Sequence, residues 1–139
     1  MRARSKKTSD IYKLRAPLVE RLLEERPYCQ ACRIFNVYDG VTYTPHRSVD
    51  IHELVSRGRG GSILDEDNLL AVCRFPCHSR ITGDSKEAEW LGLALPSWSD
   101  EETLVDAHNR RHVAESHRPT SPPEWRPDPE YWGSPFVTT

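Results

Sequence analysis

Four cysteines arranged as two close pairs constrain this chain more than any other feature of its sequence. Two residues separate Cys29 from Cys32, and three separate Cys73 from Cys77. A structural zinc ion takes four ligands in a tetrahedron, and two short cysteine turns supply them efficiently. Such a site joins segments that are distant in sequence and stabilises a domain with a small core. We therefore predict a structural Zn²⁺ on these four cysteines, in preference to buried free thiols or a redox pair.

Length and composition narrow the class of protein. With 139 residues, of which 37% are hydrophobic, the chain has room for one domain with a modest core. No stretch approaches the roughly 18 apolar residues that suggest a membrane span, and the basic N-terminus lacks the apolar segment of a secretion signal. We expect a soluble, cytoplasmic protein without disulfides, because thiols stay reduced in that compartment.

Charge is distributed unevenly along the chain, although the formal net charge is only −2. Residues 1–16 are strongly basic, and residues 84–139 are acidic. A basic N-terminal arm is suited to contact with the phosphate backbone of DNA, although a disordered, solubilising segment would have the same composition. We predict a disordered basic arm over residues 1–10, one domain over residues 11–98, and a polar helix with an irregular Pro-rich tail over residues 99–139.

Local patterns of apolar residues predict a mixed, α+β fold. Apolar residues at three- and four-residue steps predict an N-terminal amphipathic helix over residues 11–25, with Pro17 interrupting it. The remaining chain predicts strands over residues 41–44, 48–55 and 69–72, and helices over residues 75–83, 87–93 and 101–116.

The segment from Asp50 to Gly83 holds the residues with the most chemistry. A predicted strand ends in His52 and Glu53, a glycine-rich loop follows, and Asn68 begins the next predicted strand. His78 directly follows Cys77, where a short helix is expected. This order of strand, strand and helix, with His, Asn and His, resembles the ββα-metal (His-Me finger) active site of HNH endonucleases. Within that family the chain is most similar to small phage-encoded HNH proteins, over roughly residues 11–98.

The resemblance implies a metal-dependent endonuclease that hydrolyses phosphodiester bonds in DNA, by nicking or by double-strand cleavage. A divalent ion, which could be Mg²⁺, Mn²⁺, Ni²⁺ or Zn²⁺, neutralises charge that develops on the scissile phosphate. A side-chain base takes the proton from the attacking water. Histidine suits both roles, because it titrates near neutral pH and ligates metals as neutral imidazole.

The resemblance assigns roles to single residues and leaves one assignment open. In one register His52 ligates the catalytic ion and Glu53 is the general base, which requires a raised carboxyl pKa. In the other, His52 is the base and Asp50, on the same face of the strand, helps to hold the ion. Asn68 matches the Asn that fixes the loop and orients the catalytic side chain, and His78 matches the final metal ligand. Thr82 stands where many members carry a further ligand.

Four arginines flank these residues and are predicted to form a DNA clamp, because guanidinium groups bind phosphate well: Arg57, Arg59, Arg74 and Arg80. His46 is expected to be an ordinary surface residue.

Two other functions stay open. Glu53 and Thr82 differ from the residues that HNH enzymes usually carry at these positions. This difference suggests a zinc-stabilised DNA-binding module with impaired catalysis. The likeness to phage proteins suggests an accessory of a phage terminase, docked through its Pro-rich tail. The sequence does not indicate an oligomeric state.

Overall fold

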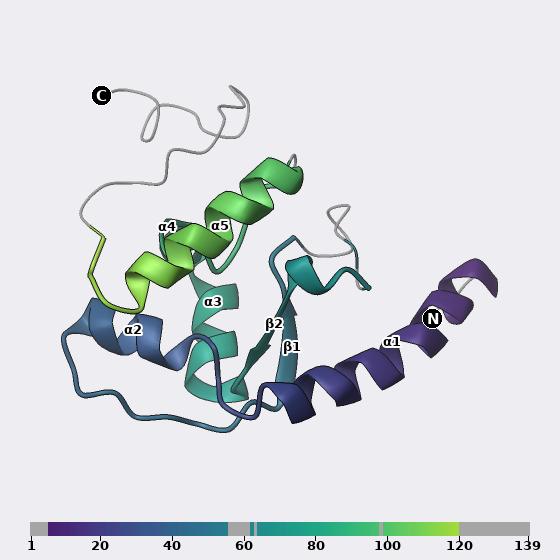
Figure 1. Ribbon diagram of the computed structural model, residues 1–139, viewed down its shortest axis with the longest axis horizontal. Coiled ribbons are helices and arrows are strands. Elements are labelled where there is room, and N and C mark those ends of the chain that lie inside the picture. The colour runs from purple at the N-terminus through teal and green to yellow at the C-terminus, as the bar shows by residue number, and fades with distance from the viewer. Residues whose placement is uncertain (1–5, 56–61, 63, 98, 120–139) are drawn as a thin grey trace.

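The fold is α+β, as predicted, and contains a small two-stranded antiparallel sheet among helices (Figure 1). The computed structural model describes residues 6–55, 62, 64–97 and 99–119. In chain order the elements are α1 (Lys6–Glu25), α2 (Cys32–Asp39), β1 (Asp50–Glu53), the 3-10 turn η2 (Glu66–Asn68), β2 (Leu69–Val72), the irregular helical turn η3 (Arg74–His78), α3 (Ser79–Gly83), α4 (Ser85–Trp90) and α5 (Glu101–Ala114).

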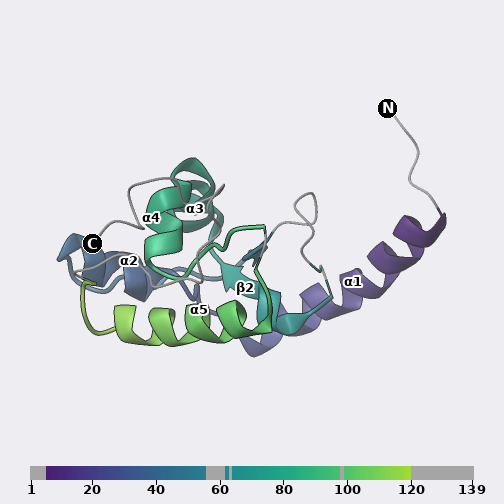
Figure 2. The ribbon, with the colours of Figure 1, turned by 90° about the horizontal axis from the view of Figure 1, so that it is seen from above.

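Helix α1 is longer than its sequence pattern predicts. It begins at Lys6, so half of the segment expected to be a disordered arm is helical, and residues 1–5 lie outside the described residues. The helix also continues through Pro17. Its second half packs on the sheet through Leu18, Val19 and Leu22, whereas its first half extends away from the body of the molecule (Figures 1 and 2).

The two strands form one short hairpin with a defined register. His52 pairs with Leu70, and Asp50 pairs with Val72. Because side chains alternate along a strand, the hairpin has two distinct faces. One face carries Ile51 and packs against α1, and the other faces the main core. The sheet is therefore covered on both sides, which explains why β2 is buried at every position.

Two strands predicted from sequence differ in the structure. The stretch 48–55 is a strand only over Asp50–Glu53, and the strand expected over residues 41–44 does not form. Gly40 ends α2 in the left-handed conformation, with φ of 71°. The backbone amides of Val41 and Thr44 then donate to the backbone and side-chain oxygens of Asn36. This segment thus satisfies its hydrogen bonds on α2 instead of on a neighbouring strand.

Helix α5 belongs to the main core, although its sequence places it in the predicted tail. Its start is fixed by a capping box between Asp100 and Thr103, and it buries Ala107 and Ala114 in the core. A Cβ added at Gly92 would lie 2.7 Å from the backbone oxygen of Ala107, so only glycine permits this close approach. In Figure 2, α5 and the α3–α4 pair lie on opposite sides of the molecule, with β2 between them.

Candidate metal centre and histidine cluster

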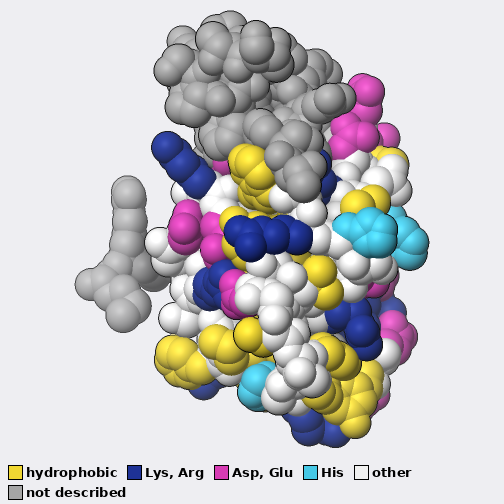
Figure 3. All heavy atoms as spheres, turned by 90° about the vertical axis from the view of Figure 1, so that its left-hand side faces the viewer, with side chains coloured by type: hydrophobic (Ala, Val, Ile, Leu, Met, Phe, Trp, Pro, Cys, Tyr) yellow, Lys and Arg dark blue, Asp and Glu magenta, His cyan; other side chains and the backbone are white. Residues whose placement is uncertain are grey.

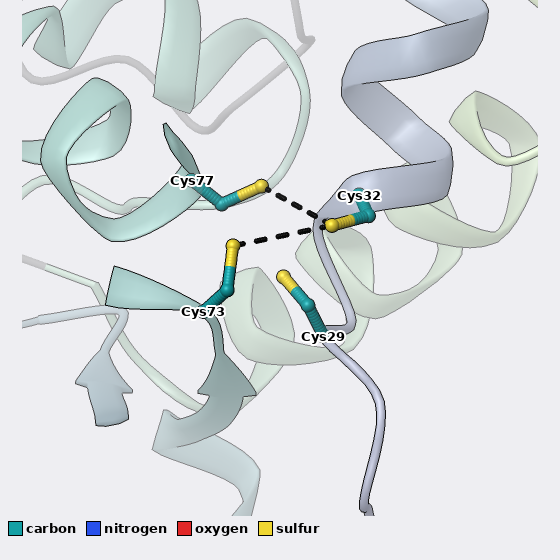
Figure 4. A group of neighbouring side chains, drawn as sticks. All are labelled: Cys29, Cys32, Cys73 and Cys77. Carbon is teal, nitrogen blue, oxygen red and sulfur yellow. Dashed lines mark hydrogen bonds between the residues drawn. The ribbon is translucent and has the colours of Figure 1, made fainter. Parts of the chain in front are cut away.

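The structure brings the four cysteines together, as their spacing predicts (Figure 4). Cys29 precedes α2 and Cys32 begins it, whereas Cys73 follows β2 and Cys77 lies in η3. All four side chains are buried, and their sulfur atoms lie within 4.8 Å of one another. The cluster therefore joins the start of α2 to the end of the hairpin.

Sulfur–sulfur distances test whether these residues fit zinc. The Sγ atom of Cys32 lies 3.7 Å from that of Cys77 and 4.0 Å from that of Cys73. A tetrahedral ion with zinc–sulfur bonds of about 2.3 Å separates its ligands by about 3.8 Å. A disulfide would need about 2.05 Å. The spacing and the donor atoms fit a tetrahedral metal site and exclude a disulfide between these pairs.

The electrostatics of the cluster also favour a cation. Hydrogen bonding, chiefly from the Cys77 thiol, lowers the pKa of Cys29 to about 5. Burial and the neighbouring Cys29 raise the pKa of Cys32 to about 12. The pKa of Cys77 is raised as well, first by its hydrogen bond to Cys29 and then by burial. One thiolate therefore opposes the ionisation of its neighbours, and a bound cation would allow all four to ionise.

His46 contacts the cysteine cluster, which the sequence analysis did not anticipate. Its ring is exposed, yet Nδ1 lies 3.4 Å from the sulfur of Cys32. The backbone oxygen of His46 also accepts a hydrogen bond from the amide of Cys29. No local motif indicates this contact, because it arises from the return of the chain after α2. His46 is therefore placed to orient the candidate metal ligand Cys32.

The histidines expected to share a catalytic ion lie next to each other. Strand alternation places Asp50 and His52 on the core-facing side of β1, and η3 brings His78 to the same place. The two imidazole centroids are 5.3 Å apart, with the ring planes at 68°. His78 Nδ1 lies 3.0 Å from an oxygen of Asp50, so this nitrogen donates to the carboxylate. Nε2 of His78 is then the nitrogen with the free lone pair.

His52 is a buried, neutral imidazole. It is 8% exposed, and its Nε2 lies 2.7 Å from the backbone oxygen of Leu93. A carbonyl can only accept, so Nε2 carries the proton and Nδ1 carries the lone pair. Burial, with smaller contributions from the charges of His78 and Arg111, lowers the pKa of His52 to about 4. The ring is therefore neutral at physiological pH, the form required of a ligand or a general base.

Glu53 is not brought together with the two histidines. It follows His52 in β1 and points to the face that α1 covers. One of its carboxylate oxygens lies 3.7 Å from the guanidinium of Arg15 in α1. This position does not suit a base acting beside His78.

Asn68 bonds to backbone groups at both ends of the glycine-rich loop. Its side-chain oxygen accepts from the amide of Val55 at 2.9 Å. Its side-chain nitrogen donates to the backbone oxygens of Val55 at 2.9 Å and of Ser62 at 2.8 Å. The amide group is buried, so these three bonds hold the start and the end of the loop together.

Of the four arginines of the predicted clamp, the structure describes Arg74 and Arg80. Arg57 and Arg59 lie outside the described residues. Arg80 makes two-point contacts with Asp39 and Glu87 and stacks on an aromatic ring of the core, and these carboxylates raise its pKa. It therefore serves the fold. Arg74 is 66% exposed and binds Asp50 through two nitrogens, at 3.2 and 2.9 Å. Of the described pair, Arg74 is the more exposed.

The geometry for a second, catalytic ion is incomplete. Within the described part of the chain, the four cysteines are the one group of three or more candidate ligands that gather this closely. The Thr82 hydroxyl donates to backbone oxygens of His78 and Ser79 inside its own helix, so it is not poised as a ligand. Asp50 is held by Arg74 and by Nδ1 of His78, and the free Nε2 of His78 points away from this carboxylate, so the two residues do not face one ion in this arrangement.

Surface charge and comparisons with known proteins complete the description. On the coloured part of the face in Figure 3, Lys and Arg side chains lie among acidic and apolar ones and form no continuous basic track. None of the helices that the structure describes has both the length and the apolar character needed to cross a bilayer.

No protein-family model, curated protein or solved structure matches the chain. The class that fold and site define is an α+β protein with a four-cysteine cluster suited to a metal ion.

Proposed function

We propose that this protein is a metal-dependent HNH endonuclease that cleaves DNA and carries a structural Zn²⁺ on its four cysteines. The observation that carries the proposal is the contact of His52 and His78 at 5.3 Å, on a strand–strand–helix frame beside the cysteine cluster. The order of β1, β2 and α3 along the chain supports the proposal, because a ββα-metal site is expected to have this order. A phage-encoded protein acting in the bacterial cytoplasm is part of this proposal.

The positions of the side chains favour one of the two role assignments left open by the sequence. Asp50 and His78 are partly exposed, with 17% and 28% of their side-chain surface accessible. His78 would hold the divalent ion, and Asp50 would join it once the hydrogen bond between the carboxylate and Nδ1 of His78 has opened. When bound, the ion would neutralise charge on the scissile phosphate. His52 is the better candidate base, because it is neutral and lies beside His78, whereas Glu53 faces α1.

The chemistry of His52 follows from its tautomer. Nδ1 carries the lone pair and would take the proton of the attacking water while the water oxygen bonds to phosphorus. The bond to the 3′-oxygen then breaks, and that oxygen is protonated by solvent, which leaves 5′-phosphate and 3′-hydroxyl ends. A pKa of about 4 makes the ring a weak base. An anionic phosphate close to the ring would raise this pKa towards neutrality.

Plasmid cleavage tests the proposal. Purified protein is incubated with supercoiled plasmid and Mg²⁺, Mn²⁺ or Ni²⁺, and nicked and linear products are measured. We expect metal-dependent cleavage that His52→Ala abolishes and that His112→Ala, a change at an exposed histidine of α5, leaves intact. The absence of metal-dependent cleavage, or equal activity of the His52 variant, would refute the nuclease.

A DNA-binding module without catalysis is the second candidate. It is favoured by the incomplete ligand set and by the hydrogen bond that occupies Nε2 of His52. DNA binding without cleavage, unchanged by His52→Ala, would select it. The third candidate, a terminase accessory, depends on the Pro-rich tail, and residues 120–139 lie outside the described residues. Loss of terminase binding on deletion of residues 119–139 would support that candidate.

A further inference from the structure

A cavity of about 700 Å³ lies between α5 and the end of the hairpin that carries η2. Its inner part is formed by two partly buried arginines, Arg26 after α1 and Arg111 in α5, together with Leu69 and Leu70 of β2. It is separate from the exposed side of the histidine cluster, where Asp50 and Arg74 lie at the other end of the strands. Neither arginine is a proposed ligand or base of the nuclease site, although the charge of Arg111 contributes to the lowered pKa of His52.

Among the described residues, the two arginines of this cavity hydrogen-bond to an amide side chain and to backbone oxygens. Arg26 donates to the side chain of Gln30 and to the backbone oxygen of Leu69, and Arg111 donates to the backbone oxygen of Gly92. Among the described residues, neither guanidinium forms an ion pair, in contrast to Arg21, Arg74 and Arg80. Burial and the charge of Arg26 lower the pKa of Arg111 to about 10, and the charge of Glu115 offsets only part of this effect. Two like charges that are partly desolvated together are unfavourable unless an anion compensates them.

The rim of the cavity differs chemically from its interior. The rim carries the exposed carboxylates of Asp65, Asp67 and Glu101. The carboxylate of Glu66 also lines the cavity and forms an ion pair with Arg21 at 2.9 Å. Leu104 and Val105 of α5 add an apolar wall, and Val105 is 58% exposed. The cavity thus offers cations inside, a small apolar surface beside them, and hydrogen-bond acceptors at its mouth.

We propose that this cavity binds a phosphate monoester of the nucleotide class. The phosphate lies between Arg26 and Arg111, because guanidinium groups bind phosphate oxygens in pairs. The base packs against Leu104 and Val105, and sugar hydroxyls donate to the carboxylates of the rim. These carboxylates repel further phosphates, so the site accepts one terminal phosphate and not a continuous strand. A free nucleotide and the 5′-phosphorylated end of a strand share this chemistry.

Calorimetric titration without added divalent metal tests the inference, so its outcome is independent of DNA cleavage. The probes are adenosine 5′-monophosphate, adenosine, and one short oligonucleotide with either a 5′-phosphate or a 5′-hydroxyl. We expect the monophosphate to bind at least about tenfold more tightly than adenosine, because charge-assisted hydrogen bonds are lost without the phosphate. Tighter binding of the phosphorylated oligonucleotide than of the free nucleotide identifies a strand end as the ligand, and the reverse identifies the nucleotide.

Variants separate binding from folding. Arg111→Met keeps much of the side-chain volume and removes the charge, so we expect an unchanged or higher Tm together with at least about tenfold weaker binding. Arg26→Met should weaken binding similarly, which keeps the test valid if one variant fails to fold. Arg47→Met, at an exposed position outside the cavity, is the matched control. Equal binding of the monophosphate and adenosine, no binding of either, or equal losses in the control overturns the inference.

Discussion

The imidazole of His78 lies against that of His52, with the ring centroids 5.3 Å apart, and two cysteines of the cluster adjoin the elements that carry these rings. Cys73 ends the hairpin that carries His52, and Cys77 directly precedes His78. A metal ion on the two sulfurs would hold the hairpin and the following helix in one arrangement. The geometry of the candidate nuclease site thus depends on the candidate metal site.

Removal of one cysteine ligand should therefore disturb both sites. We expect Cys32→Ser to lose most of the bound zinc, because a structural zinc site contributes apparent binding free energy on the order of 10 kcal/mol. The variant should show a much lower Tm and no cleavage. Metal content by mass spectrometry and thermal unfolding measure these effects. Full zinc occupancy in the variant would show that this cysteine is not a ligand.

The bonds of Asn68 predict a separate effect on stability. Asn68→Ala removes three hydrogen bonds and leaves buried backbone groups of Val55 without partners. We expect a loss of roughly 2–4 kcal/mol in the free energy of unfolding, measured by urea denaturation. Asn109→Ala, at an exposed position of α5, is the control and should change stability little. Similar small losses in both variants would contradict the role of Asn68 as the anchor of the loop.

Short-range patterns predicted the parts of the fold that local residues determine. The strand β2, helix α5 and the gathering of the four cysteines are confirmed, because a short apolar run, a polar helical segment and ligand spacing are visible within a few residues. The hydrogen bond between His52 and the Leu93 carbonyl could not be predicted, since it joins residues that are distant in sequence. The contact between Arg80 and Asp39 could not be predicted for the same reason, because Asp39 lies in another helix.

The alternation of side chains along β1 places Glu53 and His52 on opposite faces of the hairpin, and this part of the geometry is predictable from the sequence. Adjacent residues of a strand point to opposite faces, so they do not both face His78. The sequence left open which face the core would cover, because Ile51 and Leu54 favour different sides. Packing of α1 on Ile51 decides this point, and no local pattern in the strand contains that information.

In the proposed nuclease site, Arg74 and the divalent ion compete for the carboxylate of Asp50. Arg74 holds both oxygens of this carboxylate and lowers its pKa. We expect Arg74→Ala to bind Mn²⁺ roughly threefold more tightly at the histidine cluster, since the exposed ion pair no longer competes. The same variant should bind DNA more weakly, because a phosphate contact is lost.

Titration calorimetry and a DNA-binding assay measure the two effects. Arg33→Ala, at an exposed arginine of α2, is the control, and weaker Mn²⁺ binding in the Arg74 variant would contradict the competition.

Burial of His52 should make stability depend on pH in a defined window. Its pKa is about 4 in the folded protein, against an ordinary value of 6.5, so between these values the unfolded chain binds more protons. The contribution of the neutral ring is fully present above pH 6.5 and is lost as the pH falls towards 4. This difference of roughly 2.5 pH units corresponds to about 3 kcal/mol.

Replacement of His52 by glutamine isolates this contribution. Glutamine can still donate to the Leu93 carbonyl but does not titrate. Acid also protonates the cysteine ligands and Asp50, and these effects are common to both proteins. Urea unfolding at pH 7 and pH 4.5 should therefore show a smaller acid-induced loss in His52→Gln than in the wild type, by about 2–3 kcal/mol. His112→Gln should behave like the wild type, because that residue is exposed. Equal acid-induced losses in all three proteins would mean that His52 is not held neutral by burial.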